Sequence, residues 1–191
     1  MQIDSVILKE CVRNNRKAQK ALYEYCFRML MPVCYRYHIN EEDARSSLNI
    51  AFLKIIQSLS NVDLEEINFN AWAKRITINT LIDEYRKQKL QNERYHKKET
   101  DYELDIHAKR ISNTAESSFG YEHILKLLSE IPSVSAKVFE LYIIDGYTHK
   151  EIGELLEISE GTSKWHLSSA RKLLRDKLER LDILSEKKRS I

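Results

Sequence analysis

The sequence predicts an all-α protein that consists of two small helical domains joined by a polar linker. Helix-breaking residues are scarce, because the 191 residues include only 4 Gly and 2 Pro. Apolar residues recur every three or four positions through most of the chain, which is the period of an amphipathic helix. One long polar segment interrupts this period. We therefore expect domains over residues 1–90 and 120–191, with a linker over residues 91–119.

The first domain is expected to be an N-terminal helical bundle. An apolar stripe between Asp4 and about Cys34 predicts one or two helices, and Pro32 allows a bend. Acidic residues from Glu41 onward open a further helix, since negative charge suits the positive end of a helix dipole. Asn70 can cap the helix that follows, which we expect to run into the start of the linker.

The helix after Asn70 carries a polar ridge along one side. Alternating steps of four and three residues align Trp72, Ile76, Asn79, Asp83 and Arg86. A structural interpretation pairs Asp83 with Arg86 and bonds Asn79 to a neighbour. A functional interpretation makes the ridge a platform for an unstacked base, because aromatic and amide side chains stack on and hydrogen-bond single-stranded bases. The pattern alone favours neither interpretation.

Two helices are expected at the start of the second domain. The apolar pattern predicts a helix over Tyr121–Ile131, which Pro132 ends. Ser133 or Ser135 would cap the next helix, and Gly146 would end it in a C-cap position.

The stretch from Thr148 to Arg175 predicts a C-terminal helix-turn-helix. Thr148 and Glu151 have the spacing of a capping box, which marks the start of a helix. A tight connection follows at Ile158, and Ser159 caps a second helix. A short helix, a tight turn and a second helix with a polar outer face are typical of proteins that read duplex DNA.

The second helix of this motif has two different faces. Its inner face holds Ser163, Leu167, Ala170 and Leu174. Its outer face holds Trp165, Ser168, Ser169 and Lys172, with Thr162 and Lys164 at the borders. Positive charge is concentrated at Lys164, Arg171, Lys172, Arg175 and Lys177. Cations on phosphates supply much of the affinity for a duplex, and side chains near a helix start reach base edges. The alternative, a solvated helical hairpin, explains the exposed Trp less well.

Composition excludes several other classes of protein. The net charge is only +2, so affinity for nucleic acid must come from local patches. The chain contains no Gly-rich phosphate loop and no His-Glu-x-x-His motif. We therefore expect no enzymatic activity and no cofactor.

The cysteines predict a cytoplasmic protein. Cys11, Cys26 and Cys34 lack metal-pair spacing and read as reduced thiols. Cys34 and His38 lie one helical turn apart, but two ligands do not make a metal site, so no metal is predicted. No apolar run approaches the roughly twenty residues that span a bilayer. We also find no signal-peptide pattern at the N-terminus, and we expect no membrane insertion.

Motifs in both domains carry a resemblance to a known family. The first domain contains Asp43-Ala44 and Phe52-Leu53-Lys54, followed by Phe69, Ala71-Trp72, Arg75-Ile76, Asn79, Asp83 and Arg86. The second domain contains Gly146-Tyr147-Thr148, Glu151-Ile152, Leu155, Ile158–Thr162 and Ala170-Arg171. In this order, on either side of a polar linker, these motifs resemble the bacterial RNA polymerase sigma factors of the sigma-70 family, in the extracytoplasmic-function (ECF) group.

The resemblance implies a transcription initiation factor that directs core RNA polymerase to specific promoters. The first domain would melt the minus-10 element and read it as a single strand, through Phe69, Trp72, Lys74, Arg75, Asn79, Asp83 and Arg86. A flipped base would lie between that helix and the loop Val62–Phe69. The second domain would read the minus-35 element as duplex, through Thr162, Lys164, Trp165, His166, Ser168, Ser169, Arg171, Lys172 and Arg175. Among these, Lys164, Trp165, Ser168 and Ser169 are expected at base edges. Thr162, His166, Arg171 and Arg175 are expected on phosphates, which fix register without reading sequence.

The resemblance also implies two protein partners. Core RNA polymerase would be bound through Asp43, Ser46, Asn49, Ile50 and Leu53, and family members are usually held inactive by an anti-sigma factor. Ile50 stands where the family has an acidic residue. Trp165 and Ser169 replace the commoner Ser and Arg, which predicts an unusual minus-35 preference.

A second hypothesis remains open on the residues alone. The chain could be a polymerase-independent helix-turn-helix regulator whose N-terminal domain senses a ligand or dimerises. A dimer that binds a palindrome by itself would favour that hypothesis, whereas a monomer that binds core polymerase would favour the first.

Overall fold

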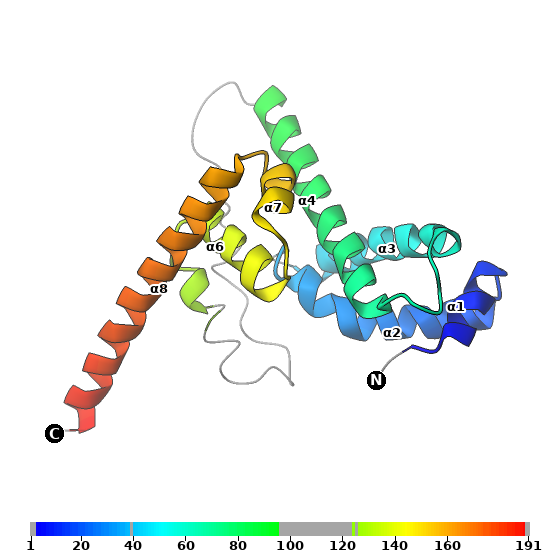
Figure 1. Cartoon of the computed structure of the whole chain (residues 1–191), viewed down its shortest axis with the longest axis horizontal. Helices are drawn as coiled ribbons and strands as arrows, with labels where there is room; N and C mark the ends of the chain where they lie inside the picture. Colours follow the sequence, from blue (N-terminus) through cyan, green and yellow to red (C-terminus); the bar gives the residue numbers. More distant parts are fainter. Residues whose placement is uncertain (1–2, 39, 96–123, 125, 190–191) are drawn as a thin grey trace. The chain divides into compact units, whose positions relative to one another are not determined.

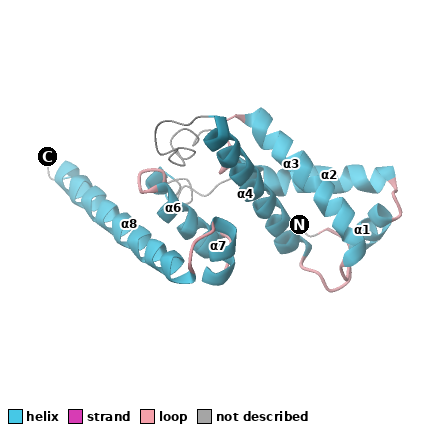
Figure 2. Ribbon diagram, turned by 90° about the horizontal axis from the view of Figure 1, so that it is seen from above, coloured by secondary structure: helices cyan, strands magenta, loops and turns pink. Residues whose placement is uncertain are grey.

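A computed structural model describes residues 3–38, 40–95, 124 and 126–189, with side chains as far as residue 87 in the first part and residue 180 in the second. These residues form helices and loops, without strands (Figure 2), so the all-α prediction is confirmed. The chain divides into two compact units, Met1–Glu99 and Thr100–Ile191. Most of the predicted linker, 91–119, lies outside the described residues.

Unit 1 is a bundle of four α-helices in which α2 makes contacts with the other three (Figure 1). The helices are α1 (Ser5–Val12), α2 (Arg16–Tyr35), α3 (Glu41–Ser58) and α4 (Phe69–Tyr95), and a 3₁₀ turn, η1 (Leu59–Asn61), follows α3. α3 also packs against α4. The bundle therefore presents α3 and α4 on a common support.

Local capping explains where the helices of unit 1 begin. The predicted first helix is interrupted at Asn14, whose φ of 62° lies in the left-handed region. Asn15 then caps α2 by accepting hydrogen bonds from the backbone N–H groups of Lys17 and Ala18. α2 continues through Pro32. The stripe predicted as one or two helices is therefore two helices.

The cap predicted for α4 was placed two residues too late. The side chain of Asn68, not that of Asn70, accepts the backbone N–H of Ala71 at 3.2 Å. Asn70 lies inside the helix, where its Oδ1 accepts the Tyr25 hydroxyl at 2.7 Å. α4 extends to Tyr95, which confirms that the predicted linker starts as helix.

The core of unit 1 lies where α2, α3 and α4 meet. Its fully buried side chains include Leu22, Cys26, Leu30, Leu48, Ala51, Ile55, Ala73 and Ile78. Burial of one large aliphatic side chain stabilises a fold by about 1.5–3 kcal/mol. This core fixes which side of α4 faces solvent.

Unit 2 packs α6 and α7 against one long helix. Its elements are α6 (Ser133–Phe139), a π-helical turn η2 (Glu140–Ile144), α7 (His149–Leu156) and α8 (Glu160–Arg189). Both α6 and α7 contact α8. One core cluster joins the segment before α6, α6 itself and α8, through Leu127, Leu128, Ile131, Ala136, Ala170 and Leu174.

Three predictions of helix ends in unit 2 have different outcomes. α6 begins at Ser133 without a side-chain cap, so the cap predicted at Ser133 or Ser135 is wrong. The predicted stop at Gly146 is confirmed, since its φ of 75° is one that glycine adopts without strain. α8 runs from Glu160 to Arg189. Of the helix predicted at Tyr121–Ile131, only residues 124 and 126–131 are described, and 126–128 are helical.

The helix-turn-helix forms as its local sequence predicts. Thr148 and Glu151 make both bonds of a capping box. Glu157 then turns the chain with a φ of 58°, and the Ser159 hydroxyl accepts the backbone N–H of Thr162 at 3.0 Å. A Cβ on Gly153 would lie 2.8 Å from the Ile158 carbonyl oxygen, so the tight turn requires glycine there.

Candidate nucleic-acid interface

The polar ridge predicted on α4 lies at the surface of unit 1. Asn79 is exposed, and the other four members, Trp72, Ile76, Asp83 and Arg86, are half-exposed. Residues on the opposite side, such as Ala73 and Ile78, are buried. The helix therefore turns this ridge, called the α4 face below, toward solvent along its length.

An aromatic cluster supports the first residue of the α4 face. The Trp72 and Phe69 ring centroids lie 5.9 Å apart, and those of Phe69 and Tyr25 lie 6.3 Å apart. Phe69 is only 3% exposed. Phe69 therefore supports Trp72 from beneath, and because a buried ring offers little surface, its predicted contact with DNA stays a prediction.

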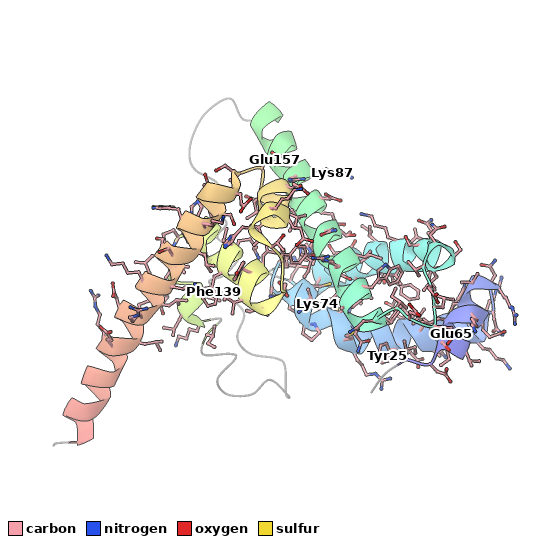
Figure 3. The ribbon with its side chains drawn as sticks, in the orientation of Figure 1. Tyr25, Glu65, Lys74, Lys87, Phe139 and Glu157 are labelled. Carbon is pink, nitrogen blue, oxygen red and sulfur yellow. The ribbon has the colours of Figure 1, made fainter. Side chains whose placement is uncertain are left out.

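Cations flank the α4 face. Lys74 is half-exposed, and Arg75 and Lys87 are exposed, and they add to the charge of Arg86 in the face itself. Figure 3 labels Lys74 and Lys87, which lie at different points along the length of α4. Together they give this side of unit 1 the local positive charge that phosphate binding needs.

Two ion pairs join α4 and the loop before it to neighbouring helices. Asp83 lies 3.7 Å from the Lys54 ammonium on α3. In the loop before α4, Glu65 forms an ion pair with Lys9 of α1, and Figure 3 shows Glu65 beside that helix. The hydrogen bond from Lys9 is the main reason that the pKa of Glu65 falls below its ordinary value. The loop predicted to hold a flipped base thus contacts α1 through a surface ion pair, a weak type of contact.

The residues predicted to bind polymerase share the exposed side of α3. We call Asp43, Ser46, Asn49, Ile50 and Leu53 the α3 face, and all five are exposed. Ile50 and Leu53 expose 43% and 57% of their surface. The Tyr23 hydroxyl donates to Asn49 Oδ1 at 2.8 Å, and its ring meets Phe52 edge-on at 5.0 Å. The face therefore combines two exposed apolar side chains with three polar ones.

Asp43 contributes to this face differently from the other four residues. Its Oδ2 accepts the Asn40 amide at 2.6 Å, and its backbone N–H donates to Asn40 Oδ1 at 2.7 Å. These reciprocal bonds cap α3. The carboxylate is thus already engaged in holding the helix start.

In unit 2, the two faces predicted for the second helix of the motif are confirmed on α8. Ser163, Leu167, Ala170 and Leu174 are buried. The outer side exposes Thr162, Lys164, Trp165, Ser168, Arg171, Lys172 and Arg175, with Ser169 half-exposed. We call Thr162, Lys164, Trp165, Ser168, Ser169 and Lys172 the α8 face.

Two histidine–serine contacts hold α8 in place. His166 Nδ1 lies 2.9 Å from the Ser135 hydroxyl of α6, and His149 Nδ1 of α7 lies 2.9 Å from the Ser163 hydroxyl. Tyr142 stacks on His149, with the ring centroids 4.4 Å apart. α8 is therefore fixed by hydrogen bonds to both of the helices that support it.

The structure gives His166 a different place from its predicted one on a DNA phosphate. The ring is half-buried and in contact with Ser135, and burial lowers its pKa below the ordinary value. A histidine in this environment favours the neutral form, which lacks the charge for a phosphate contact. The ring therefore helps to hold α8 against α6, and a phosphate contact by His166 stays a prediction.

Lys164 is paired within its own helix. Its ammonium lies 2.6 Å from Glu160 Oε1, and both side chains are exposed. The hydrogen bond from Lys164 is the main cause of the lowered pKa of Glu160. Because exposed pairs of this kind are weak, the lysine can leave its partner for an anion at little cost.

No metal centre is formed by the described residues, where no three His, Cys, Asp or Glu side chains come together. Cys34 is buried, which raises the pKa of its thiol to about 12. His38 Nε2 instead lies 2.7 Å from the Ser47 hydroxyl. None of the helices in the described ranges combines the length and apolar character that a membrane crossing requires.

Tyr25 and Lys54 are two contributors to these faces that the sequence did not assign to them. Tyr25 is on α2 and was placed in an apolar stripe, although it lies against Phe69 and bonds to Asn70. Lys54 reaches Asp83 from α3. Both contacts join residues that are distant in sequence, so no local pattern could have indicated them.

Comparison with known proteins identifies both units. Residues 22–91 match the family model for sigma-70 region 2, and residues 121–174 match the model for sigma-70 region 4. The first range contains the α3 and α4 faces, and the second contains the α8 face. Together the two ranges span more than half of the chain.

Individual proteins agree with the family models. The ECF RNA polymerase sigma factor SigW of Bacillus subtilis (strain 168) is 28% identical over 174 residues, which cover 78% of this chain and 82% of that protein. A solved structure of the sigma factor RpoE in complex with the anti-sigma factor NepR, from Bartonella quintana, is 16% identical. It covers 84% of this chain and 96% of that chain with a TM-score of 0.54, which shows a shared fold. The chain belongs to the sigma-70 family of RNA polymerase sigma factors, in its ECF group.

Proposed function

We propose that this sigma factor binds core RNA polymerase and reads a promoter at two places, as a single strand through the α4 face and as duplex through the α8 face. The observation that carries the proposal is that one chain presents two separate cation-bearing faces of different construction. Each lies in the range that matches its own sigma-70 region.

The α4 face suits a base that has left the helical stack. Trp72 is half-exposed and rests on the buried ring of Phe69, so its indole is held in place for stacking. Stacking of one base on an aromatic side chain is worth roughly 1–3 kcal/mol, which offsets much of the cost of unpairing. The exposed amide of Asn79 offers both a donor and an acceptor to a base edge. Lys74 and Arg75 supply charge for the phosphates of that strand.

The α8 face suits the major groove of an intact duplex. Ser159 caps α8, and the helix start leads directly into the exposed side chains of Lys164 and Trp165. Side chains in this position reach base edges when a recognition helix lies in the groove. Arg171 and Arg175 lie further along α8 and are proposed to contact phosphates.

The α3 face is the proposed contact with core polymerase. Its two exposed apolar side chains, Ile50 and Leu53, offer surface whose burial would be favourable. An anti-sigma factor is a second proposed partner, as in the complex of RpoE with NepR. We propose that the protein acts in the cytoplasm, without membrane insertion and without enzymatic activity of its own.

No particular observation favours the polymerase-independent regulator. Such a protein needs a helix-turn-helix, but it has no use for a sigma-70 region 2 that matches residues 22–91. Its dimer or ligand site would have to lie in that same domain.

Run-off transcription with core RNA polymerase tests the proposal. Core polymerase alone should give no specific transcript, and addition of the chain should give transcripts with defined starts from a subset of genomic promoters. Co-elution of the chain with core polymerase at low salt is the accompanying binding measurement. A chain that neither binds core polymerase nor changes its transcripts would overturn the proposal.

A further inference from the structure

Trp165 is the most prominent apolar group on the α8 face. Among the large hydrophobic side chains that the structure describes, it has the largest exposed fraction, 64%. Its neighbours one turn before and one turn after are small: Gly161, Thr162, Ser168 and Ser169. The indole therefore projects beyond the side chains around it, and it would be the first to meet the floor of a groove that α8 enters.

The indole is also held in a defined orientation. The ring of His166 meets Trp165 edge-on, with centroids 4.9 Å apart and an interplanar angle of 75°. His166 is in turn bonded to the buried hydroxyl of Ser135 on α6. An aromatic side chain supported in this way loses little conformational freedom when it binds.

The chemistry of the indole restricts what it can read. It offers one N–H donor, no acceptor, and two apolar faces. Among the groups that base edges present in the major groove, the 5-methyl group of thymine is the apolar group that projects furthest. The hydroxyl side chains beside it accept and donate to several bases alike, so they add little discrimination.

We propose that Trp165 gives this sigma factor a requirement for thymine at one position of its duplex element, read through the thymine 5-methyl group. The proposal rests on the proposed function, because it needs α8 in the major groove. It adds the chemical group that is recognised and the residue that recognises it. Burial of one methyl group against the indole would also explain why so apolar a side chain stands on a DNA-facing helix.

The test uses the full chain with core RNA polymerase. Promoter duplexes randomised in the upstream region are first selected for binding, which defines the enriched element. Each thymine of that element is then replaced singly by deoxyuridine, which removes the methyl group and leaves the pairing edge unchanged. At one position, deoxyuridine should weaken wild-type binding roughly fourfold, the effect of one buried methyl group.

Two variants assign the effect to Trp165. Trp165→Ala should bind the thymine and deoxyuridine duplexes equally, whereas Ser168→Ala, a change on the same face, should keep the wild-type ratio. Equal binding of every deoxyuridine duplex by the wild type, or an unchanged ratio in Trp165→Ala, would overturn this inference and leave the proposed function standing. If no upstream element is enriched although core polymerase is bound, both this inference and duplex reading by α8 fail.

Discussion

The two tryptophans of the chain stand in different surroundings. Trp72 in unit 1 is half-exposed and rests on the buried ring of Phe69, whereas Trp165 in unit 2 is 64% exposed among small side chains. A supported aromatic surface beside an amide suits an unstacked base, which must gain new stacking when it leaves its own. A projecting indole on a convex helix suits a duplex whose bases stay stacked and present only their edges. Under the proposed function, both faces would bind DNA through cations but would select it by different contacts.

The largest effect is expected from a change that disturbs the turn before α8 and with it the α8 face. Gly153→Ala would place a Cβ 2.8 Å from the Ile158 carbonyl oxygen, so the turn between α7 and α8 must shift. Overpacking of this kind typically costs about 1–3 kcal/mol. Hydrogen exchange resolved to α7 and α8 should show faster exchange, and duplex reading should fall with it, while unit 1 stays protected.

Gly161→Ala is the matched control for that change. A Cβ at Gly161 would meet its nearest neighbour, the Ser159 hydroxyl oxygen, at 3.7 Å, which is ordinary contact. Hydrogen exchange in α7 and α8 of Gly161→Ala should stay close to that of the wild type. Equal destabilisation by both variants would show that the close approach at Gly153 is not what the turn depends on.

The next largest effect concerns the α4 face, which is proposed to read a single strand. Asn79→Ala should lower transcription from duplex promoters roughly tenfold, because one or two hydrogen bonds to an unstacked base are lost. Binding to core polymerase should not change, and a template already unpaired at the minus-10 element should restore most of the activity. Gln57→Ala, an exposed amide on α3, is the control and should behave as the wild type. If the unpaired template fails to rescue Asn79→Ala, the base-reading role of the α4 face is wrong.

A smaller effect separates two kinds of contact on α8. Arg175→Ala should weaken all duplexes alike and reduce the slope of log affinity against log salt concentration by about 0.9, as expected for one lost phosphate contact. Lys164→Ala should change the preferred upstream sequence instead. Titrations of selected and scrambled duplexes at several salt concentrations measure both quantities. An equal shift in sequence preference by the two variants would contradict this assignment.

The smallest effect comes from His166. Burial lowers its pKa, so the fold prefers the neutral ring, and unit 2 should lose stability as the pH falls below the ordinary histidine value of about 6.5. A histidine on a phosphate would do the opposite, since DNA would raise its pKa and binding would strengthen in acid. His166→Gln should therefore reduce the pH dependence of stability without lowering the salt slope. A reduced salt slope would return His166 to the phosphate contacts.

Local sequence was sufficient for the parts of the fold that depend on neighbouring residues. The capping box at Thr148 and Glu151 and the two faces of α8 follow from spacing within one or two turns, and the structure confirms them. The ridge on α4 was predicted in the same way. The pattern could not show that Phe69, the residue that begins α4, is buried, because it packs against Tyr25 from a different helix.

Packing between helices explains the remaining differences. The resemblance places His166 on a phosphate, but it could not show that α6 brings Ser135 against the ring. Asn68 and Asn70 are equally good caps as residue types, and the choice depends on which one the loop leaves at the helix start. Such contacts become visible only when distant segments are placed together.

Reactivity of unpaired thymines in a promoter tests the central claim most directly, that one face holds opened DNA while the other holds duplex. Permanganate oxidation should be measured on the same promoter with core polymerase alone and with the chain added. The account predicts reactive thymines near the start site only when the chain is present, with the upstream element unreactive and protected from nuclease. Reactivity equal to that with core polymerase alone, or unpaired thymines in the upstream element, would contradict it.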